Sequence, residues 1–183
     1  MSRVGASVAL AALVVWAVFV LAGMALSPPL AAGLAVLAAV ASVTVFRNSV
    51  PVAGAIAVLA PFGVMLPALA IRHVAVTLGI PVPGFSTIEL FVFLVAYVAF
   101  LCTAFNILPF DLYRQGFAPW SVAGMVLLVC IYALVTGNWF LAGVAVFGQL
   151  AWVMGWGSSN WFDMMLHVLL VPIAAVALIL RVV

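Results

Sequence analysis

The sequence predicts an all-α fold, a polytopic membrane helical bundle of six to seven transmembrane helices with a short interfacial or re-entrant segment near residues 72–84. Of its 183 residues, 70% are hydrophobic and 4% are charged, whereas a soluble domain carries roughly 25% charged residues. Apolar runs recur along the chain, near the length of about 20 residues that crosses a bilayer as a helix. We therefore expect one integral membrane domain over residues 1–183, whose outer surface contacts the lipid bilayer.

Three apolar runs occupy the first part of the chain. Ala6 to Leu26 is longer than the apolar core of a signal peptide, which predicts a retained spanning helix. Leu30 to Phe46 is rich in Ala and Gly, and such small side chains predict close packing against a neighbouring helix. Val50 to Ile71 is the third candidate span. It contains Pro61 and Pro67, and a proline inside a helix removes a backbone hydrogen bond and bends the helix.

A more polar segment follows the third span. Arg72 and His73 are expected to anchor its end at the membrane interface. Val74 to Ile80 is apolar but too short to cross, which predicts an interfacial or re-entrant piece. Ser86 and Glu89 then match the capping-box pattern at the beginning of a fourth helix, which runs to about Leu108.

Three further runs complete the chain. Trp120 to Val135 and Trp139 to Trp156 predict a fifth and a sixth helix, and the last helix runs from an Asn160 N-cap to Leu180. The second, fifth and sixth runs are near the minimum spanning length, so six spans and seven both fit. Four tryptophans fall at predicted ends, as expected for an aromatic belt: Trp120, Trp139, Trp156 and Trp161.

The charged residues narrow the possible functions. All five bases are arginine, so chemistry that needs a lysine Schiff base is excluded. The net charge of +2 does not suggest nucleic acid as a partner. In a seven-span topology, three arginines lie on the N-terminal side and two on the other, which favours a cytoplasmic N-terminus in the cell membrane. The first group is Arg3, Arg47 and Arg114, and the second is Arg72 and Arg181.

The last predicted helix contains the strongest candidate site. Asn160, Asp163 and His167 are spaced at i, i+3 and i+7, so they share one helical face. Asp163 is explained as part of the helix cap. His167 is the only ionisable residue well inside a predicted span, where such groups usually mark a ligand or proton pathway. The alternative is a single interhelical hydrogen bond from His167.

Other polar residues also require partners inside a bundle. They are His73, Asn106 and Gln149, which are further candidates for a ligand or proton-handling site. The alternatives are an interfacial anchor for His73 and hydrogen bonds between helices for Asn106 and Gln149. The sequence contains no metal-ligand spacing, nucleophile motif or acid pair, so it leans against an enzyme. It identifies no cofactor.

One short motif resembles a known family. The stretch Phe105-Asn106-Ile107-Leu108-Pro109-Phe110 resembles a helix of the site-2 intramembrane metalloproteases, over about six residues. That family continues the pattern to an aspartate that binds zinc, where this chain has Arg114 followed by Gln115. Its His-Glu-x-x-His helix is also missing, because Leu69 and Ala70 stand where His and Glu would precede His73. The resemblance therefore implies a catalytically inactive relative.

Two function classes fit the whole chain. The first is a small-solute transporter or its membrane subunit, predicted by proline-broken helices and a few interior polar groups. In size and helix number the chain is similar to the substrate-binding membrane subunits of energy-coupling-factor vitamin transporters, although no residue motif carries this likeness. The second class is a non-catalytic subunit of a larger complex, in which other membrane subunits are the partners.

Overall fold

The computed structural model describes residues 3–59 and 63–182, which form helices joined by turns. The helices are α1 (Arg3–Ala22), α2 (Pro28–Val43), α3 (Val50–Leu59), α4 (Met65–Thr77), α5 (Thr87–Ala104), the short 3-10 helix η1 (Tyr113–Phe117), α6 (Pro119–Thr136), α7 (Trp139–Val153), α8 (Trp161–Met165) and α9 (Leu170–Val182). The predicted all-α class is confirmed. By length and composition, three described helices can cross a membrane, α1, α5 and α6, while α2, α4, α7 and α9 are shorter and apolar. Seven full spans are not confirmed.

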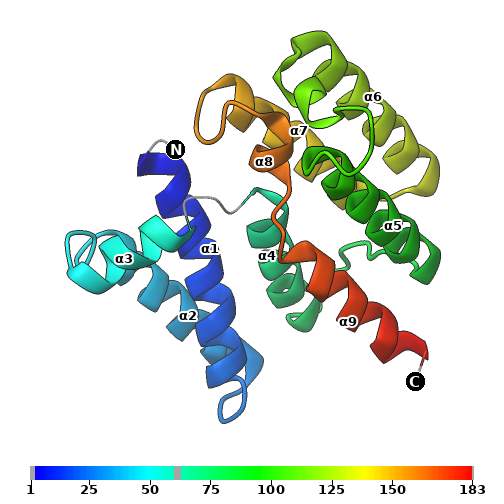
Figure 1. The fold of residues 1–183 in the computed structure, drawn as a ribbon. Helices are drawn as coiled ribbons and strands as arrows, with labels where there is room; N and C mark the ends of the chain where they lie inside the picture. The colour runs from blue at the N-terminus through cyan, green and yellow to red at the C-terminus, as the bar shows by residue number, and fades with distance from the viewer. Residues whose placement is uncertain (1–2, 60–62, 183) are drawn as a thin grey trace.

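Helix α4 lies between two groups of helices (Figure 1). Helices α1, α2 and α3 form one group, in which α1 packs along α2 and also contacts α3 and α4. The other group contains α5 to α9, in which α6 packs on α7 and α5 on α9. This order places the α4 region, near the middle of the chain, where both groups can contact it.

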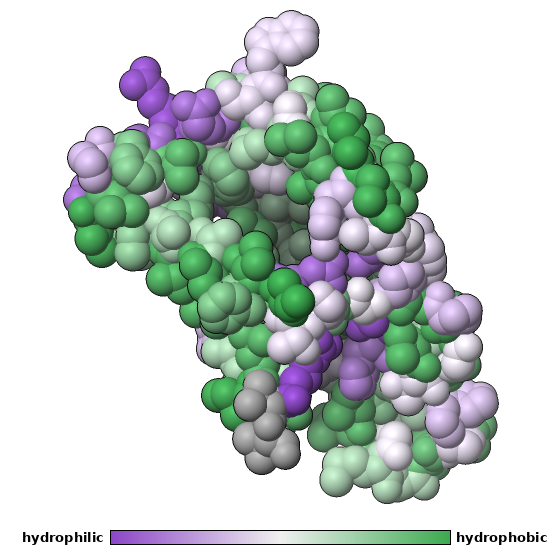
Figure 2. All heavy atoms as spheres, turned by 90° about the vertical axis from the view of Figure 1, so that its right-hand side faces the viewer, coloured by the Kyte–Doolittle hydropathy of each residue, from purple (hydrophilic) through white to green (hydrophobic). Residues whose placement is uncertain are grey.

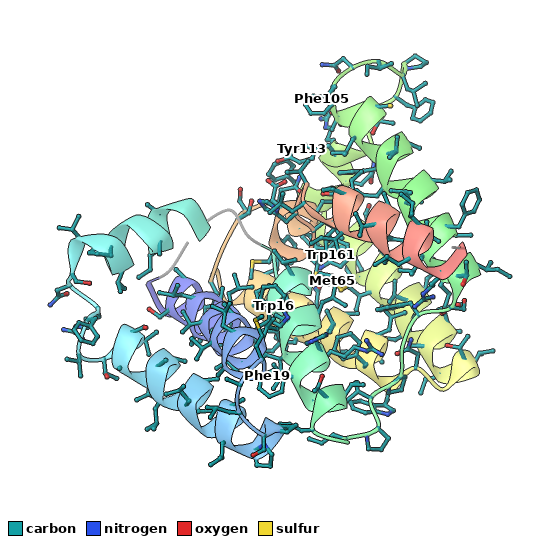
Figure 3. All side chains as sticks on the ribbon, turned by 90° about the horizontal axis from the view of Figure 1, so that it is seen from below. Trp16, Phe19, Met65, Phe105, Tyr113 and Trp161 are labelled. Carbon is teal, nitrogen blue, oxygen red and sulfur yellow. The ribbon has the colours of Figure 1, made fainter. Side chains whose placement is uncertain are left out.

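The first group is held by small side chains. Ala31, Ala35 and Ala39 recur every four residues on α2 and are almost fully buried. Phe19 of α1 packs against this stripe and against Val74 of α4. Figure 3 shows Phe19 on the side of α1 that faces α4. The predicted close packing of the Ala-rich second run is therefore confirmed.

The second group has a core of larger residues. Valines of α6 and α7 pack around Trp161 and Met165 of α8, and Met65 of α4 joins them. Figure 3 shows Met65 beside Trp161 near the centre of the molecule. Trp161 is 7% exposed, so its predicted place in an interfacial belt is wrong. Trp120 and Trp139 are 91% and 58% exposed, as a belt requires.

Two of the predicted spans are interrupted. The run from Val50 to Ile71 consists of α3 and α4, and Pro61 lies outside the described residues. Helix α4 does not end at Ile71 but continues through Arg72 and His73, so the predicted separate segment from residue 72 is wrong. The chain becomes extended only after α4, up to the Ser86 cap.

The last predicted helix is also interrupted. Helix α8 ends at Met165, Leu166 adopts an extended conformation (φ −110°, ψ 151°), and α9 begins at Leu170. The cause is common to both interruptions. Pro67 and Pro172 are each the third residue of the helix that follows the break, a position in the first turn where a missing N–H costs least. Further inside a continuous helix, each ring would clash with the carbonyl four residues before it.

The surface is largely hydrophobic. Many large apolar side chains are more than half exposed, among them Leu37, Leu134 and Leu180. Figure 2 shows large hydrophobic areas on both sides of a narrower band of hydrophilic residues. A surface of this kind suits contact with hydrocarbon, because lipid tails are as apolar as these side chains.

Candidate functional site

The two interruptions pack against each other. The backbone N–H of Val64 donates to the carbonyl of Met164 over 2.8 Å. Gly63 is buried here, and a Cβ on it would lie 2.6 Å from the backbone carbon of Met165. Only glycine allows this approach of two backbones. We call this contact between residues 63–64 and 164–166 the break junction.

An apolar cavity of about 370 Å³ adjoins the break junction. It lies between α1, α4, α7 and the junction itself. On α4 it is lined by Pro67, Ala68 and Ile71, and on α7 by residues from Trp139 to Ala151. Trp139 and Ala151 are twelve positions apart on α7, which corresponds to about 18 Å along the helix. Gly143 lines the cavity with open space where a Cβ would be placed.

His167 lies in the second interruption, between α8 and α9. Its Nδ1 accepts a hydrogen bond of 3.1 Å from the backbone N–H of Leu169, and its carbonyl accepts from Leu170. These bonds satisfy backbone groups at the beginning of α9, in the way a cap residue does. A neutral ring that accepts at Nδ1 carries its proton on Nε2. The helical face predicted for Asn160, Asp163 and His167 is not formed, because α8 ends before His167.

Asn160 and Asp163 belong to a polar cluster instead. Asn160 caps α8 by accepting from the N–H of Phe162, as predicted, and its Nδ2 donates to the carbonyl of Tyr113 over 2.8 Å. Asp163 accepts from the Tyr113 hydroxyl over 2.6 Å and from Ser158 over 3.3 Å. The hydrogen bond to Asp163, with burial and the carboxylate charge adding to it, raises the pKa of Tyr113 to about 12.

An aromatic row fixes this polar cluster to α5. Phe93, Tyr97 and Phe100 follow one another along one face of the helix. The Phe100 ring lies 4.5 Å, between centroids, from that of Phe162 on α8, and 6.3 Å from that of Tyr113. Sequence reasoning missed Tyr113. Its spacing from Asp163 is 50 residues, so no local pattern could have paired them.

At the other end of α7, side chains from three elements bind the connection between α4 and α5. Arg72 donates to the carbonyls of Pro83 (2.7 Å) and Val82 (3.3 Å). Asn138 donates to the Gly84 carbonyl over 3.0 Å, and Arg181 donates to the Phe85 carbonyl over 2.8 Å. Each of the four carbonyls from residue 82 to residue 85 therefore accepts a side-chain hydrogen bond. We call residues 82–85 the clasped loop. Arg72 and Arg181 thus bind the same loop.

The remaining candidates do not converge on a site. His73 is exposed on α4. Asn106 is exposed after α5, where its φ of 58° places it in the left-handed conformation of a helix C-terminal cap, so it is not an interior group. The Gln149 side chain has a buried Oε1 without a hydrogen-bond partner among the described residues. The hydrogen bond between helices predicted for Gln149 is therefore not seen.

The residues at the break junction can bind a ligand through apolar contacts. The nearby ionisable side chain is His167, which follows Leu166 of the junction. Among residues 3–59 and 63–182, no three His, Cys, Asp or Glu side chains gather as metal ligands. Comparisons of the chain with protein-family models, curated proteins and solved structures give no match. The resemblances to site-2 metalloproteases and to vitamin-transporter subunits therefore stay predictions.

Proposed function

We propose that this protein is a membrane transporter, or the membrane subunit of one, which binds a small apolar solute in the cavity beside the break junction. The observation that carries the proposal is the Val64–Met164 backbone contact between two interrupted helices, next to that cavity. In secondary transporters, substrate sites are typically formed by discontinuous helices near the middle of the membrane. The apolar lining favours an apolar solute over a sugar, an amino acid or an ion.

Photolabelling of the cavity tests this proposal. The protein is reconstituted in vesicles and labelled with a long-chain alcohol that carries a diazirine, and the labelled peptides are identified by mass spectrometry. We expect labelling of residues 139–151 that an excess of the unlabelled alcohol suppresses. Labelling of exposed helix faces by probe dissolved in the bilayer does not saturate, and this difference separates binding from partitioning.

Two glycine variants provide the matched comparison. Gly143 lines the cavity and Gly124 of α6 does not, and a Cβ at either position meets no atom within 4 Å. Gly143→Leu should fill the cavity and abolish the saturable labelling, whereas Gly124→Leu should preserve it. Both changes remove a helical glycine, so their effects on helix propensity match. Equal labelling in both variants would contradict the cavity as the binding site.

The second candidate function is that of a non-catalytic subunit, and helix α3 favours it. Its described part, Val50–Leu59, has 10 residues, and among the described elements it packs mainly on α1. Val50 at its beginning is 85% exposed. A partner helix can cover such a surface. Mass analysis after mild solubilisation distinguishes the two functions, because a subunit co-purifies with a stoichiometric larger complex.

The transporter proposal includes a location in the cell membrane with a cytoplasmic N-terminus. Asn138 is the N-cap of α7 and Val153 is the last residue of that helix. The helix rise places these two residues about 22 Å apart. The clasped loop lies at the first end, and η1 with Arg114 lies near the second through its contacts with α8. Cysteines replacing Thr77 and Arg114 should react with an impermeant thiol reagent from opposite sides, with Arg114 labelled from the cytoplasm.

A further inference from the structure

Two arginines converge on the clasped loop. Arg72 comes from α4 and Arg181 from the end of α9, and their acceptors, Pro83 and Phe85, are two residues apart. The described residues provide both guanidinium groups with backbone carbonyls but with no carboxylate. A carbonyl satisfies an N–H donor without cancelling the positive charge. Two positive charges therefore meet at one end of an apolar bundle.

Among the described residues, the acidic side chain near this end has other partners. Glu89 accepts from the backbone N–H of Ser86 and, at Oε1, from the hydroxyl of Tyr132 over 2.6 Å. It thus completes the capping box of α5 and does not neutralise the arginines. A cation at the edge of a hydrophobic region is costly without a counter-charge, so the pair of arginines favours an anion.

One of these arginines, Arg72, lies beside one end of the cavity. Ile71 lines the cavity, and Arg72 is the next residue of α4. Phe140 also lines the cavity, and the Arg72 Cζ lies 5.9 Å from the centroid of its ring. A chain lying along α7 in the cavity would therefore bring its end toward the Phe140 ring, and the Arg72 guanidinium lies close to that ring.

We infer that the ligand of this cavity is a single-chain anionic lipid, with its hydrocarbon chain in the cavity and its headgroup at Arg72 and Arg181. The inference rests on the proposed function, since it gives the chemical class of the solute. The volume of about 370 Å³ is near the lower limit for ligand pockets, which suits one chain and not two. The charge of the arginines selects an anionic headgroup over a neutral one.

A pair of probes that differ only in the headgroup tests the inference. A diazirine-bearing fatty acid is compared with the alcohol of the same chain, in phosphatidylcholine vesicles at alkaline pH, where the acid is ionised. Wild-type protein should be half-labelled in its cavity at about tenfold lower acid than alcohol, a ratio that corresponds to about 1.4 kcal/mol. Raising the salt concentration should reduce this preference, because salt screens exposed charges.

Arginine variants assign the preference to its source. Arg181→Gln retains a donor for the Phe85 carbonyl but removes the charge, and it should lose most of the preference for the acid. Arg181→Lys should keep it. Arg72→Gln should also reduce the preference for the acid over the alcohol. Arg181 is exposed, so its variants are expected to fold, and they test the inference even if Arg72→Gln does not fold.

The outcomes for the two proposals are distinct. Saturable cavity labelling by both probes with equal half-saturation would overturn the anionic-lipid inference while the proposed function stands. A preference for the acid that survives both Gln variants would also overturn it. If neither probe labels the cavity saturably, the proposed function and the inference both fail.

Discussion

Tyr113 joins two parts of the chain that are distant in sequence. Its hydroxyl donates to Asp163 and its carbonyl accepts from Asn160, so one residue fixes η1 to the beginning of α8. Gly116 reinforces this contact, because a Cβ there would overlap the Asn160 side chain. The polar cluster thus determines where α8 begins, and the position of α8 determines the break junction.

The tyrosine hydrogen bond should make stability depend on alkaline pH. The folded pKa of Tyr113 is about 12, above the value of about 10 for an unfolded tyrosine. A raised folded pKa gives stability that is fully present below pH 10 and is lost as pH rises toward 12. Tyr113→Phe should therefore lower the free energy of unfolding by about 1 kcal/mol at neutral pH, an amount discounted for partial exposure.

Unfolding followed by tryptophan fluorescence from pH 7 to about 12 measures this effect. The difference between wild type and Tyr113→Phe should be constant up to pH 10 and then shrink. Tyr97→Phe is the control at neutral pH, where it should lower the stability less than Tyr113→Phe, since the described residues give the Tyr97 hydroxyl no hydrogen bond. A wild-type minus Tyr113→Phe difference that stays constant through pH 12 would show that the bond to Asp163 is not formed.

At the scale of the element, helix α5 begins with a capping box that the sequence alone predicted. Ser86 accepts from the N–H of Glu89, and Glu89 accepts from the N–H of Ser86. Ser86→Ala should cost about 1 kcal/mol of stability, the usual loss for a helix N-cap. Glu89→Gln should cost less, because an amide oxygen can still accept. Thermal unfolding measures both, and a complete loss of function in a well-folded Glu89→Gln protein would indicate a role beyond the cap.

Gly63 tests the packing of one interruption on the other. Gly63→Ala places a Cβ against the backbone of Met165, which cannot move as a flexible side chain can. We expect a loss of about 1–3 kcal/mol, as for overpacking in a core. Gly124→Ala is the matched control, with open space around its Cβ, and it should be neutral or stabilising by up to about 1 kcal/mol. Thermal unfolding in detergent would compare them, and equal stabilities would contradict the close contact.

These elements show what the sequence could and could not predict. Hydropathy located α1, α2, α5, α6 and α7, because each coincides with one apolar run bounded by polar or cap residues. It could not distinguish a bent span from two short helices at Pro67 and Pro172, since both have the same composition. The error moved His167 from a predicted helix interior into a connection between helices. The pairings of Tyr113 with Asp163 and of Arg72 with the clasped loop are tertiary, and no local pattern encodes them.

At the scale of the whole molecule, the two groups of helices meet around α4 and the break junction. Helix α4 contacts α1 in the first group, while its Met65 joins the core of the second. The cavity has walls from both groups. A movement of one group relative to the other would therefore change the shape of the cavity. Such a movement would either keep the Val64–Met164 hydrogen bond of the break junction or break it.

Disulfide formation across the break junction tests this arrangement most directly. Cysteines replace Val64 and Met164 in a protein whose native Cys102 and Cys130 are changed to serine. The backbone hydrogen bond of 2.8 Å between these residues implies Cα atoms about 5–6 Å apart, within the range of a disulfide. We predict rapid cross-linking by a mild oxidant in native membranes, and no cross-link between cysteines at positions 64 and 179. If the 64–164 pair stays reduced while both thiols react with a small alkylating reagent, the two interrupted helices do not meet and the proposed site is wrong.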